Sequence, residues 1–359
     1  MPDLSVDICG LSFANPVLAA AGPGTRNGAM CLAAARGGAG GIVTKTVSTA
    51  PASVPRPCMS VVRGGFLNTE LWSEQPVEKW LATEYPEARE AGVPVIVSLG
   101  YTAGQIAGLA PLVAPFADAL ELSTHYVPDD PSPVLAALAA AKAAVSVPVF
   151  VKLSPHPDIR ELAVALAAAG ADGLVMINSF GPCLALDLDT GLPLMGSRDG
   201  YGWLSGPAIK PLAVRCVYEA ARAVSIPVIG VGGVTSGRDV AEMLMAGAAA
   251  VQVCTAAVLK GPAVYGTLAG ELDRFLAGRG RDGLPAIRGL AHRAVRSFST
   301  TAAAPEVDAG RCNRCGLCRT SCVYQAITLA AGWQVDPGRC FGCGLCVSRC
   351  PRGALRLPA

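Results

Sequence analysis

Two cysteine-rich runs near the end of the chain have the residue spacing most directly suited to chemistry. They read "RCNRCGLCRTSCVYQAI" and "RCFGCGLCVSRCPRGAL", and both follow the pattern C-x2-C-x2-C-x3-C. Thiolates at these short intervals converge on one point, which is the arrangement that binds an iron–sulfur cluster. Because the pattern occurs twice, it predicts two clusters, which would move single electrons.

The pattern also predicts which cysteines share a cluster. In bacterial ferredoxins with two clusters, the fourth cysteine of each run binds the cluster of the other run. We therefore expect one [4Fe-4S] cluster on Cys312, Cys315, Cys318 and Cys350, and a second on Cys340, Cys343, Cys346 and Cys322. Zinc fits less well, because four ligands satisfy it and the third cysteine of a run is then idle. Disulfides would need an oxidising compartment.

The composition is that of a folded, apolar chain. Of its 359 residues, 52% are hydrophobic and 16% are charged, which is too apolar for disorder. The net charge of +2 comes without a basic block, so nucleic acid is not an expected partner. The apolar stretch "VLAALAAAKAAVSVPVFV" is interrupted by Lys142 and Pro148, so no membrane span is predicted. The N-terminal "MPDLSVDICG" lacks the pattern of a signal segment, and we expect a cytoplasmic protein with reduced thiols.

Short apolar runs rich in Val, Ile and Leu recur before the cysteines. Eight of them stand at 16–22, 40–46, 93–100, 118–123, 147–154, 172–179, 226–233 and 249–255. Uninterrupted apolar strands are buried on both faces, as in parallel sheets, and Ala-rich helical stretches lie between these runs. The alternation predicts an α/β fold, a (β/α)8 TIM barrel whose polar residues collect at the C-terminal ends of the strands. A doubly wound sheet is the second interpretation.

The chain therefore divides into two predicted domains. Residues 1–300 would form the catalytic barrel, and residues 301–359 a small ferredoxin-like domain with two [4Fe-4S] clusters. Two intervals within the barrel, 46–92 and 180–225, are longer than a helix requires. Insertions of this length at the C-terminal end of a barrel form lids or substrate walls.

The segments after the last two apolar runs are suited to a phosphate. They read "GVGGVTSGRDV" and "QVCTAAV", in which Gly232 and Gly233 would let backbone N–H groups approach an anion and Thr255 would add a hydroxyl. Lys45 and Lys152 end two other apolar runs, where an unpaired buried lysine would be costly. Lysines beside a phosphate site suggest FMN, whose reduced ring carries negative charge. FMN would couple the one-electron clusters to two-electron chemistry.

The sequence resembles the dihydroorotate dehydrogenases, and more closely the FMN and iron–sulfur part of the dihydropyrimidine dehydrogenases. Motifs such as "GLSFANPVLAAAGPGT", "GFLNTELWSEQP", "VFVKLSP" and "LSGPAIKPLA" occur in the family's order along nearly the whole chain. The resemblance implies FMN contacts at Ala20, Lys45, Thr46, Lys152, Asn178, Gly206, Gly232, Gly233, Cys254 and Thr255. It implies pyrimidine contacts at Asn68, Glu70, Asn178 and Ser179, whose polar groups can pair with the C=O and N–H groups of the ring.

One segment departs from the family. Where the family reads like "LELNLSCPH", with a substrate-binding asparagine and an acid/base cysteine, this chain reads "LELSTHYVPDDPSP". Ser123 stands in place of the asparagine, and we expect it to contact the substrate. Tyr126 falls at the place of the cysteine, with His125 beside it. We predict that one of these two residues handles the proton that accompanies hydride transfer. The alternative is that His125 is an ordinary residue of the rim.

Together these inferences predict an FMN-dependent iron–sulfur oxidoreductase acting on a carbon–carbon bond of a small, polar, cyclic, pyrimidine-like substrate that is unsaturated in its oxidised form. Electrons would pass through the clusters to or from a partner, either a ferredoxin or a reductase subunit with FAD and an NAD(P)H site, because no second dinucleotide fingerprint is found. A homo-oligomer or hetero-oligomer is expected. The alternatives are a dihydroorotate dehydrogenase proper, a reductase of a non-pyrimidine conjugated substrate, and an electron-transfer subunit without its own substrate.

Overall fold

The chain folds into two compact units. The computed structural model describes residues 2–123, 130–294, 300–330 and 332–358, and the units are Met1–Ala294 and Val295–Ala359. The sequence analysis placed the division after residue 300. The last element of the first unit is the short helix α11 (Leu290–Arg293), which packs against the barrel helices and ends just before the division.

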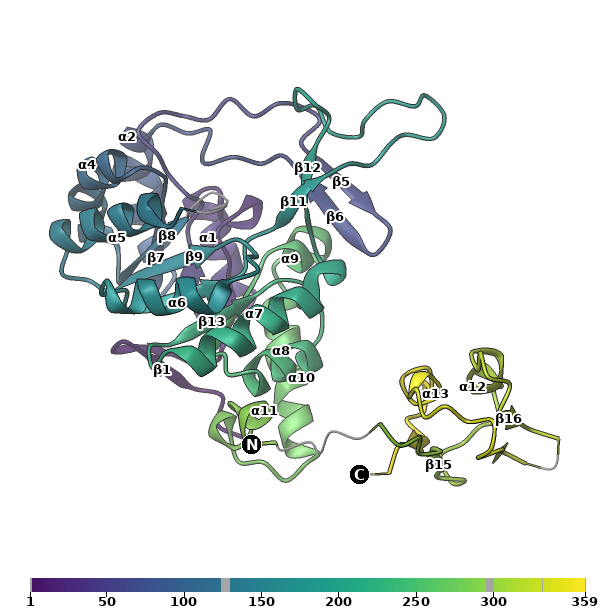
Figure 1. The fold of residues 1–359 in the computed structure, drawn as a ribbon. Helices are drawn as coiled ribbons and strands as arrows, with labels where there is room; N and C mark the ends of the chain where they lie inside the picture. The colour runs from purple at the N-terminus through teal and green to yellow at the C-terminus, as the bar shows by residue number, and fades with distance from the viewer. Residues whose placement is uncertain (1, 124–129, 295–299, 331, 359) are drawn as a thin grey trace. The chain divides into compact units, whose positions relative to one another are not determined.

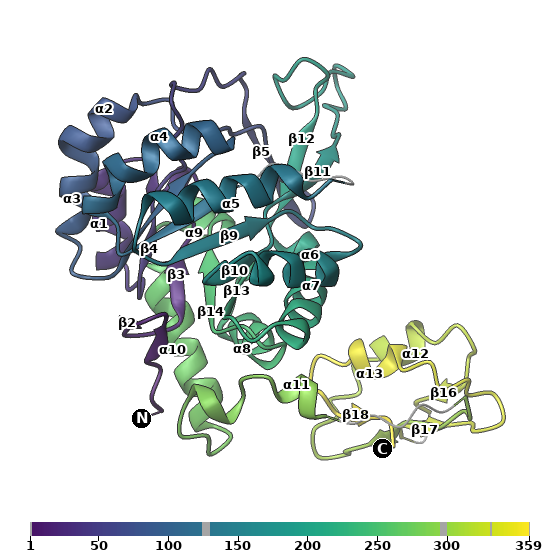
Figure 2. The same cartoon turned by 60° about the vertical axis from the view of Figure 1, so that its left-hand side comes forward.

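The first unit is a closed barrel of eight parallel strands. In order around the barrel these are β10 (Gly173–Met176), β13 (Val228–Val231), β14 (Ala250–Val253), β3 (Val17–Ala19), β4 (Ile42–Val43), β7 (Val95–Leu99), β8 (Ala119–Ser123) and β9 (Val149–Leu153). Each of the eight predicted runs contains one of these strands. The TIM barrel is therefore confirmed over the doubly wound sheet (Figure 2).

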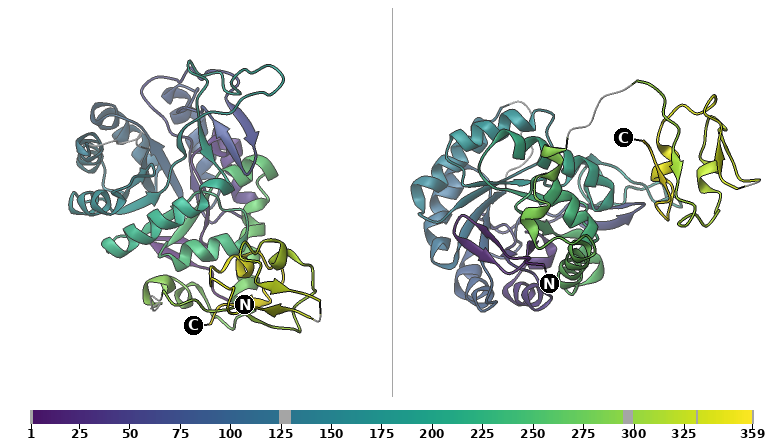
Figure 3. Two further views of the ribbon diagram at one scale, coloured as in Figure 1. Left: turned by 45° about the vertical axis from the view of Figure 1, so that its right-hand side comes forward. Right: turned by 90° about the horizontal axis from the view of Figure 1, so that it is seen from below.

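A helical segment follows each barrel strand and covers the outside of the barrel, which Figure 3 shows from below. The segments are α1 (Gly28–Arg36), α2 (Val77–Lys79) continuing through a π-helical turn (Trp80–Glu84) into α3 (Tyr85–Arg89), α4 (Ala103–Val113), α5 (Ser132–Ala144), α6 (Ile159–Ala168), α7 (Lys210–Ala223), α8 (Gly237–Met245) and α10 (Val264–Ala277), which the short α9 (Thr255–Lys260) precedes. Helix α8 shows a sequence-encoded start, because Ser236 and Asp239 form a reciprocal capping box.

Apolar side chains fill the barrel interior and the space under the helices. Leu18, Ile96 and Phe150 lie inside the ring of strands, and a second cluster joins the strands to the surrounding helices. Phe13, from the hairpin β1 (Val6–Ile8) and β2 (Leu11–Phe13), lies against Gly41 at the start of β4 and closes the N-terminal end. Burial of each such side chain is worth about 1.5–3 kcal/mol. The strands therefore form a firm frame for the polar residues at their other ends.

Both long insertions contribute to one small antiparallel sheet. The first insertion supplies β5 (Met59–Val62) and β6 (Gly65–Asn68), and the second supplies β11 (Phe180–Cys183) and β12 (Gly202–Ser205), in the order β11-β12-β6-β5 (Figure 1). The pairing of β12 with β6 sets Trp203 opposite Asn68 and Ser205 opposite Phe66. Segments far apart in sequence thereby meet in a single wall beside the barrel.

The second unit consists of two similar halves. Strands β15 (Glu306–Val307) and β18 (Leu355–Arg356) pair with each other, as do β16 (Ile327–Thr328) and β17 (Gln334–Val335). Each half has a one-turn helix, α12 (Leu317–Thr320) or α13 (Leu345–Ser348), directly after a glycine with φ near +80°. These are Gly316 and Gly344, at equivalent places in the cysteine pattern, where a left-handed backbone favours glycine. Among the residues that the structure describes, no helix has both the length and the apolarity to cross a membrane.

Candidate active site

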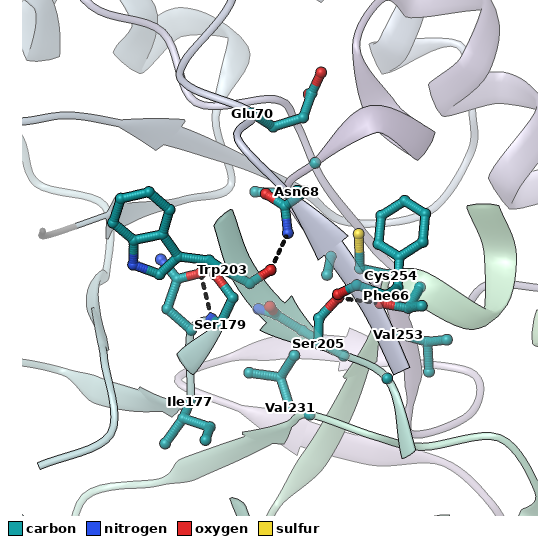
Figure 4. Close-up of a pocket in the computed structure, with 18 of the residues that line it drawn as sticks. Phe66, Asn68, Glu70, Ile177, Ser179, Trp203, Ser205, Val231, Val253 and Cys254 are labelled. Carbon is teal, nitrogen blue, oxygen red and sulfur yellow. Dashed lines mark hydrogen bonds between the residues drawn. The ribbon is translucent and has the colours of Figure 1, made fainter. Parts of the chain in front are cut away.

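A cavity of about 380 Å³ lies at the C-terminal ends of the barrel strands and is bounded on one side by the small sheet (Figure 4). Every described residue predicted to contact FMN or the substrate lines it: Ala20, Lys45, Thr46, Asn68, Glu70, Ser123, Lys152, Asn178, Ser179, Gly206, Gly232, Gly233, Cys254 and Thr255. The predicted catalytic residues, His125 and Tyr126, lie outside the described residues.

Glycines shape the wall of the cavity next to helix α7. Gly206, Gly232 and Gly233 have φ values of 81°, 127° and 74°. A Cβ atom on Gly232 would lie 2.9 Å from the Cβ of Ala213, and one on Gly233 would lie 2.6 Å from the Cβ of Lys210. The loop after β13 therefore lies directly against the start of α7, where only glycine fits. Such a glycine loop beside a helix start is the usual setting for a phosphate in a TIM barrel.

A buried hydrogen-bonded network crosses the barrel interior at the base of the cavity. Lys152 Nζ, on β9, donates to Glu121 Oε1 on β8 at 3.2 Å and to Gln252 Oε1 on β14 at 3.0 Å. Gln252 Nε2 in turn donates to Glu121 Oε2 at 2.5 Å. Glu121 and Gln252 are fully buried, and Lys152 is 4% exposed. The carboxylate compensates the buried ammonium and, together with the amide, fixes it at the cavity surface.

Lys45 forms a second ion pair in the same cavity. Its ammonium pairs with the carboxylate of Glu70, and the two side chains are only 4% and 12% exposed. Glu70, a predicted substrate contact, therefore lines the cavity and also compensates the charge of Lys45. Each of the two lysines that line the cavity thus has its own carboxylate partner.

The small sheet presents amide, hydroxyl and aromatic groups to the cavity. Asn68 Nδ2 donates to the carbonyl oxygen of Trp203 at 3.2 Å, a contact visible in Figure 4, and the hydroxyls of Ser205 and Thr255 lie 2.8 Å apart. Across the cavity, Asn178 Oδ1 accepts a hydrogen bond from the Ser179 backbone N–H at 2.9 Å. These bonds fix the direction in which each amide faces, so the cavity presents fixed donors and acceptors.

Tyr101 and Cys254 add two neutral proton-bearing groups to the lining. Tyr101 follows β7, and its ring contacts that of Trp72 edge-on at 5.3 Å. Burial raises the pKa of Tyr101 to about 12. Burial also raises the pKa of the Cys254 thiol, although the charges of Lys152 and Lys45 act in the opposite direction. Both groups therefore stay protonated near neutral pH.

The polar residues of the site that were not predicted from sequence include Tyr101, Glu121, Ser205 and Gln252. Glu121 and Gln252 are each flanked on both sides by apolar residues within a strand, a signal like the one that identified the two lysines. Tyr101 directly follows the run at 93–100. Ser205 carried no comparable signal, because its place depends on the pairing of β12 with β6.

The second unit contains a small cavity surrounded by cysteines from both halves. Cys312, Cys315, Cys318 and Cys350 line it, together with apolar residues that include Trp333. This is the set expected to share one cluster. The fourth cysteines occupy equivalent settings, because Cys322 Sγ accepts from the Ala326 backbone N–H at 3.4 Å and Cys350 Sγ from that of Ala354 at 3.3 Å. Within the described residues, no three Cys, His, Asp or Glu side chains are grouped closely enough to hold a single metal ion.

Comparison with known proteins agrees with this geometry. The family model described as "Dihydroorotate dehydrogenase" matches residues 3–276. The chain belongs to the dihydroorotate dehydrogenase family. A second model, "4Fe-4S dicluster domain", matches residues 311–354, which identifies the second unit as a ferredoxin-like domain. As a dihydroorotate dehydrogenase family member, the chain is a flavin-dependent oxidoreductase that acts on CH–CH groups.

Several relatives carry the name dihydroorotate dehydrogenase B (NAD(+)), catalytic subunit. That of Methanothermobacter thermautotrophicus is 37% identical over 302 residues, which cover 80% of this chain and 98% of the relative. That of Methanosarcina mazei is 39% identical over 307 residues, covering 81% and 96%, and that of Geobacter sulfurreducens is 38% identical over 293 residues, covering 78% and 95%. These family members are covered almost completely, so this chain carries additional sequence beyond what they contain.

Proposed function

We propose that this chain transfers two hydrogens across a carbon–carbon bond of an uncharged pyrimidine-like ring, with FMN in the barrel and two [4Fe-4S] clusters that connect it to a redox partner. The observation that carries the proposal is the Lys45–Glu70 ion pair, in a cavity whose other predicted substrate contacts are amide and hydroxyl groups. The pair leaves Lys45 compensated before any substrate binds.

The residues of the cavity fit FMN. The close approach of Gly232 and Gly233 to α7 leaves backbone, without side chains, at the place suited to a phosphate. Lys152 stands at the base of the cavity, where its ammonium would face a flavin ring that gains negative charge on reduction. When bound, FMN would accept or give the hydride. The protein would hold the ring, exclude water and set the charge beside it.

The cysteines of the second unit fit iron–sulfur clusters. One group of four surrounds a cavity, and the other four occupy the equivalent places in the repeat. The two clusters would supply one-electron transfer between the flavin and a partner. Each fourth cysteine is fixed by a backbone N–H bond to its sulfur, and such bonds tune the reduction potential of a cluster.

The charge of the substrate follows from the Glu70 carboxylate. A ring that carries its own carboxylate, such as orotate, would meet Glu70 as a like charge and would have to compete with it for Lys45. An uncharged ring of the uracil class avoids this repulsion and can pair its C=O and N–H groups with Asn68 and Asn178. Glu70 therefore favours the neutral substrate.

The proton that accompanies the hydride would come from the segment after β8. Ser123, the last residue of that strand, lines the cavity, and His125 and Tyr126 follow it in sequence. We retain these two residues as the proposed candidates for the acid/base. Tyr101, from the neighbouring strand end, offers a second phenol in the same cavity.

Oxidation of dihydroorotate is the second candidate function. It is favoured by the relatives, whose names specify dihydroorotate dehydrogenase B. Glu70 and the missing strand-end asparagine are the observations against it.

A flavin reoxidation screen separates the candidates. The protein is purified without oxygen, reduced with one equivalent of dithionite, and mixed with uracil, thymine, orotate or a conjugated enoic acid while the flavin absorbance is followed. We expect uracil or thymine to reoxidise the flavin at least about tenfold faster than orotate, a difference of about 1.4 kcal/mol in barrier. Faster reoxidation by orotate would favour the second candidate. Reoxidation by the enoic acid alone would indicate a non-pyrimidine substrate, and no response to any compound would indicate an electron-transfer subunit.

A further inference from the structure

The ferredoxin-like unit exposes a small apolar patch that its own core does not use. The patch consists of Val323, Tyr324 and Phe341, which are 74%, 39% and 65% exposed. The rings of Tyr324 and Phe341 stack on each other, with centroids 5.0 Å apart and planes 18° from parallel. Aromatic rings that gather on a surface, rather than standing singly, mark interaction sites. We call these three residues the aromatic patch.

The aromatic patch adjoins cysteines that belong to one predicted cluster. Val323 directly follows Cys322, and Phe341 directly follows Cys340. Both cysteines are expected to bind the second cluster, whose other ligands are Cys343 and Cys346. A protein bound at the patch would therefore lie beside the ligands of that cluster.

Arginines with neutral partners flank the aromatic patch. Arg339 Nη2 donates to Gln325 Oε1 at 3.4 Å, next to Tyr324, and Arg349 Nε donates to Ser321 Oγ at 3.2 Å, one residue before Cys322. Both arginines are exposed. Since glutamine and serine carry no charge, the two guanidinium charges remain available to a partner.

The whole unit carries a positive excess. Residues 295–359 include eight arginines and no lysine, against Glu306, Asp308 and Asp336, a formal excess of five positive charges. Among the described residues of the unit, the ion pair found is that of Arg356 with Glu306, on the β15–β18 ribbon. The remaining arginines of the described part therefore give this surface a basic field that attracts acidic molecules.

We propose that the aromatic patch, with Arg339 and Arg349, is the docking surface for an acidic one-electron carrier protein of the ferredoxin type, which exchanges electrons with the second cluster. An apolar centre with a charged rim is the usual anatomy of a transient protein interface, and the arginines select a partner of opposite charge. This inference rests on the two proposed clusters but not on the identity of the substrate.

The test measures binding rather than turnover. Full-length protein with its clusters intact is titrated with fluorescently labelled, oxidised plant-type ferredoxin, an acidic carrier, and the dissociation constant is read from anisotropy at low and at high salt. We expect binding at 50 mM NaCl that weakens at least tenfold at 300 mM, because the steering charges are screened. Basic cytochrome c should not bind. No binding of ferredoxin at low salt, or binding that is indifferent to salt, would overturn the proposal.

Paired variants locate the surface. Arg339→Gln with Arg349→Gln, and separately Phe341→Ser, should each weaken ferredoxin binding at least fivefold. Arg160→Gln removes one exposed positive charge from the barrel, outside the ferredoxin-like unit, and should change binding less than twofold. Iron content and the cluster spectrum establish that each variant is loaded. Equal weakening by Arg160→Gln, or tighter binding of a DNA duplex than of ferredoxin, would contradict the assignment.

The result of the ferredoxin binding test does not depend on which substrate reacts in the barrel. If ferredoxin binds as expected while neither uracil nor orotate reoxidises the flavin, the substrate proposal fails and the docking surface stands. If the substrate reacts but ferredoxin does not bind, or binds only to the patch variants, the docking proposal alone fails.

Discussion

Lys152 Nζ lies 3.2 Å from Glu121 Oε1 inside the barrel, and both side chains are almost completely withdrawn from solvent. A buried ion pair of this kind contributes little net stability, but removing one partner leaves an uncompensated charge at a cost of about 3–5 kcal/mol. The pair therefore serves to hold a compensated ammonium at the base of the cavity.

Replacing Glu121 should alter the redox behaviour of the site. Glu121→Gln keeps the size and the polar atoms but removes the negative charge, so Lys152 would exert its full positive charge on the cavity. We expect the midpoint potential of the bound flavin to rise by on the order of 30 mV, which equals about 1.4 kcal/mol for a two-electron couple. Spectroelectrochemistry checks this. Glu219→Gln, which removes a surface partner of Arg215, is the matched control, and an equal rise in that variant would refute the explanation.

Glu70 should determine which ring is accepted. Glu70→Gln removes the carboxylate that compensates Lys45 and frees that ammonium for a charged ring. We expect the preference for uracil over orotate, measured as the ratio of kcat/KM values, to fall by about tenfold or more, equivalent to about 1.4 kcal/mol of differential binding. The change should lie mainly in the orotate value. An unchanged ratio would show that Glu70 does not discriminate by charge.

The glycine loop should be required for cofactor retention. Gly232→Ala places a Cβ 2.9 Å from that of Ala213 on a backbone with φ of 127°, so the loop must move away from α7. We expect the flavin to be retained at least about tenfold less tightly, a loss of about 1.4 kcal/mol or more. Gly104→Ala is the control, because a Cβ there meets no atom within 4 Å and lies in helix α4. Equal flavin content in the two purified variants would contradict this prediction.

Proton transfer should depend on the segment after β8. Either Tyr126→Phe or His125→Asn should lower turnover by about 100-fold or more, the usual contribution of a general acid. Tyr101→Phe is the matched variant, because it removes a phenol that lines the cavity. Since burial raises the pKa of Tyr101 to about 12, this group stays protonated across an assay range of about pH 6–9, and it should contribute no inflection to the pH profile there. If the first two variants keep full turnover and Tyr101→Phe alone is slow, the proton is handled from β7.

Sequence alone predicted the barrel because its signal is local. Each strand lies in a largely apolar run that ends in glycine or in polar residues, and the cysteine spacing determines the second unit directly. The small sheet could not be predicted in the same way, because β6 and β12 come from separate insertions and pair only in the folded chain. The contact between Asn68 and Trp203, and the position of Ser205, depend on that pairing.

Sequence alone predicted the lysines of the site but not which carboxylates pair with them. The lysines were recognised as costly residues in apolar runs, but the partner that compensates each one depends on the three-dimensional arrangement of the strands. Glu121 and Gln252 lie on strands that are not neighbours, and their side chains meet only because the barrel closes. Glu70 lies in an insertion, where sequence offers no measure of its distance from Lys45. Ion-pair partners across a barrel are therefore the part of the site that required coordinates.

The most direct measurement of the whole account is the cofactor content of the full-length protein purified without oxygen. One FMN and about eight irons per chain, as two four-iron clusters require, are the predicted result. A protein that contains no flavin, or one with zinc in place of iron, would contradict the account at its centre.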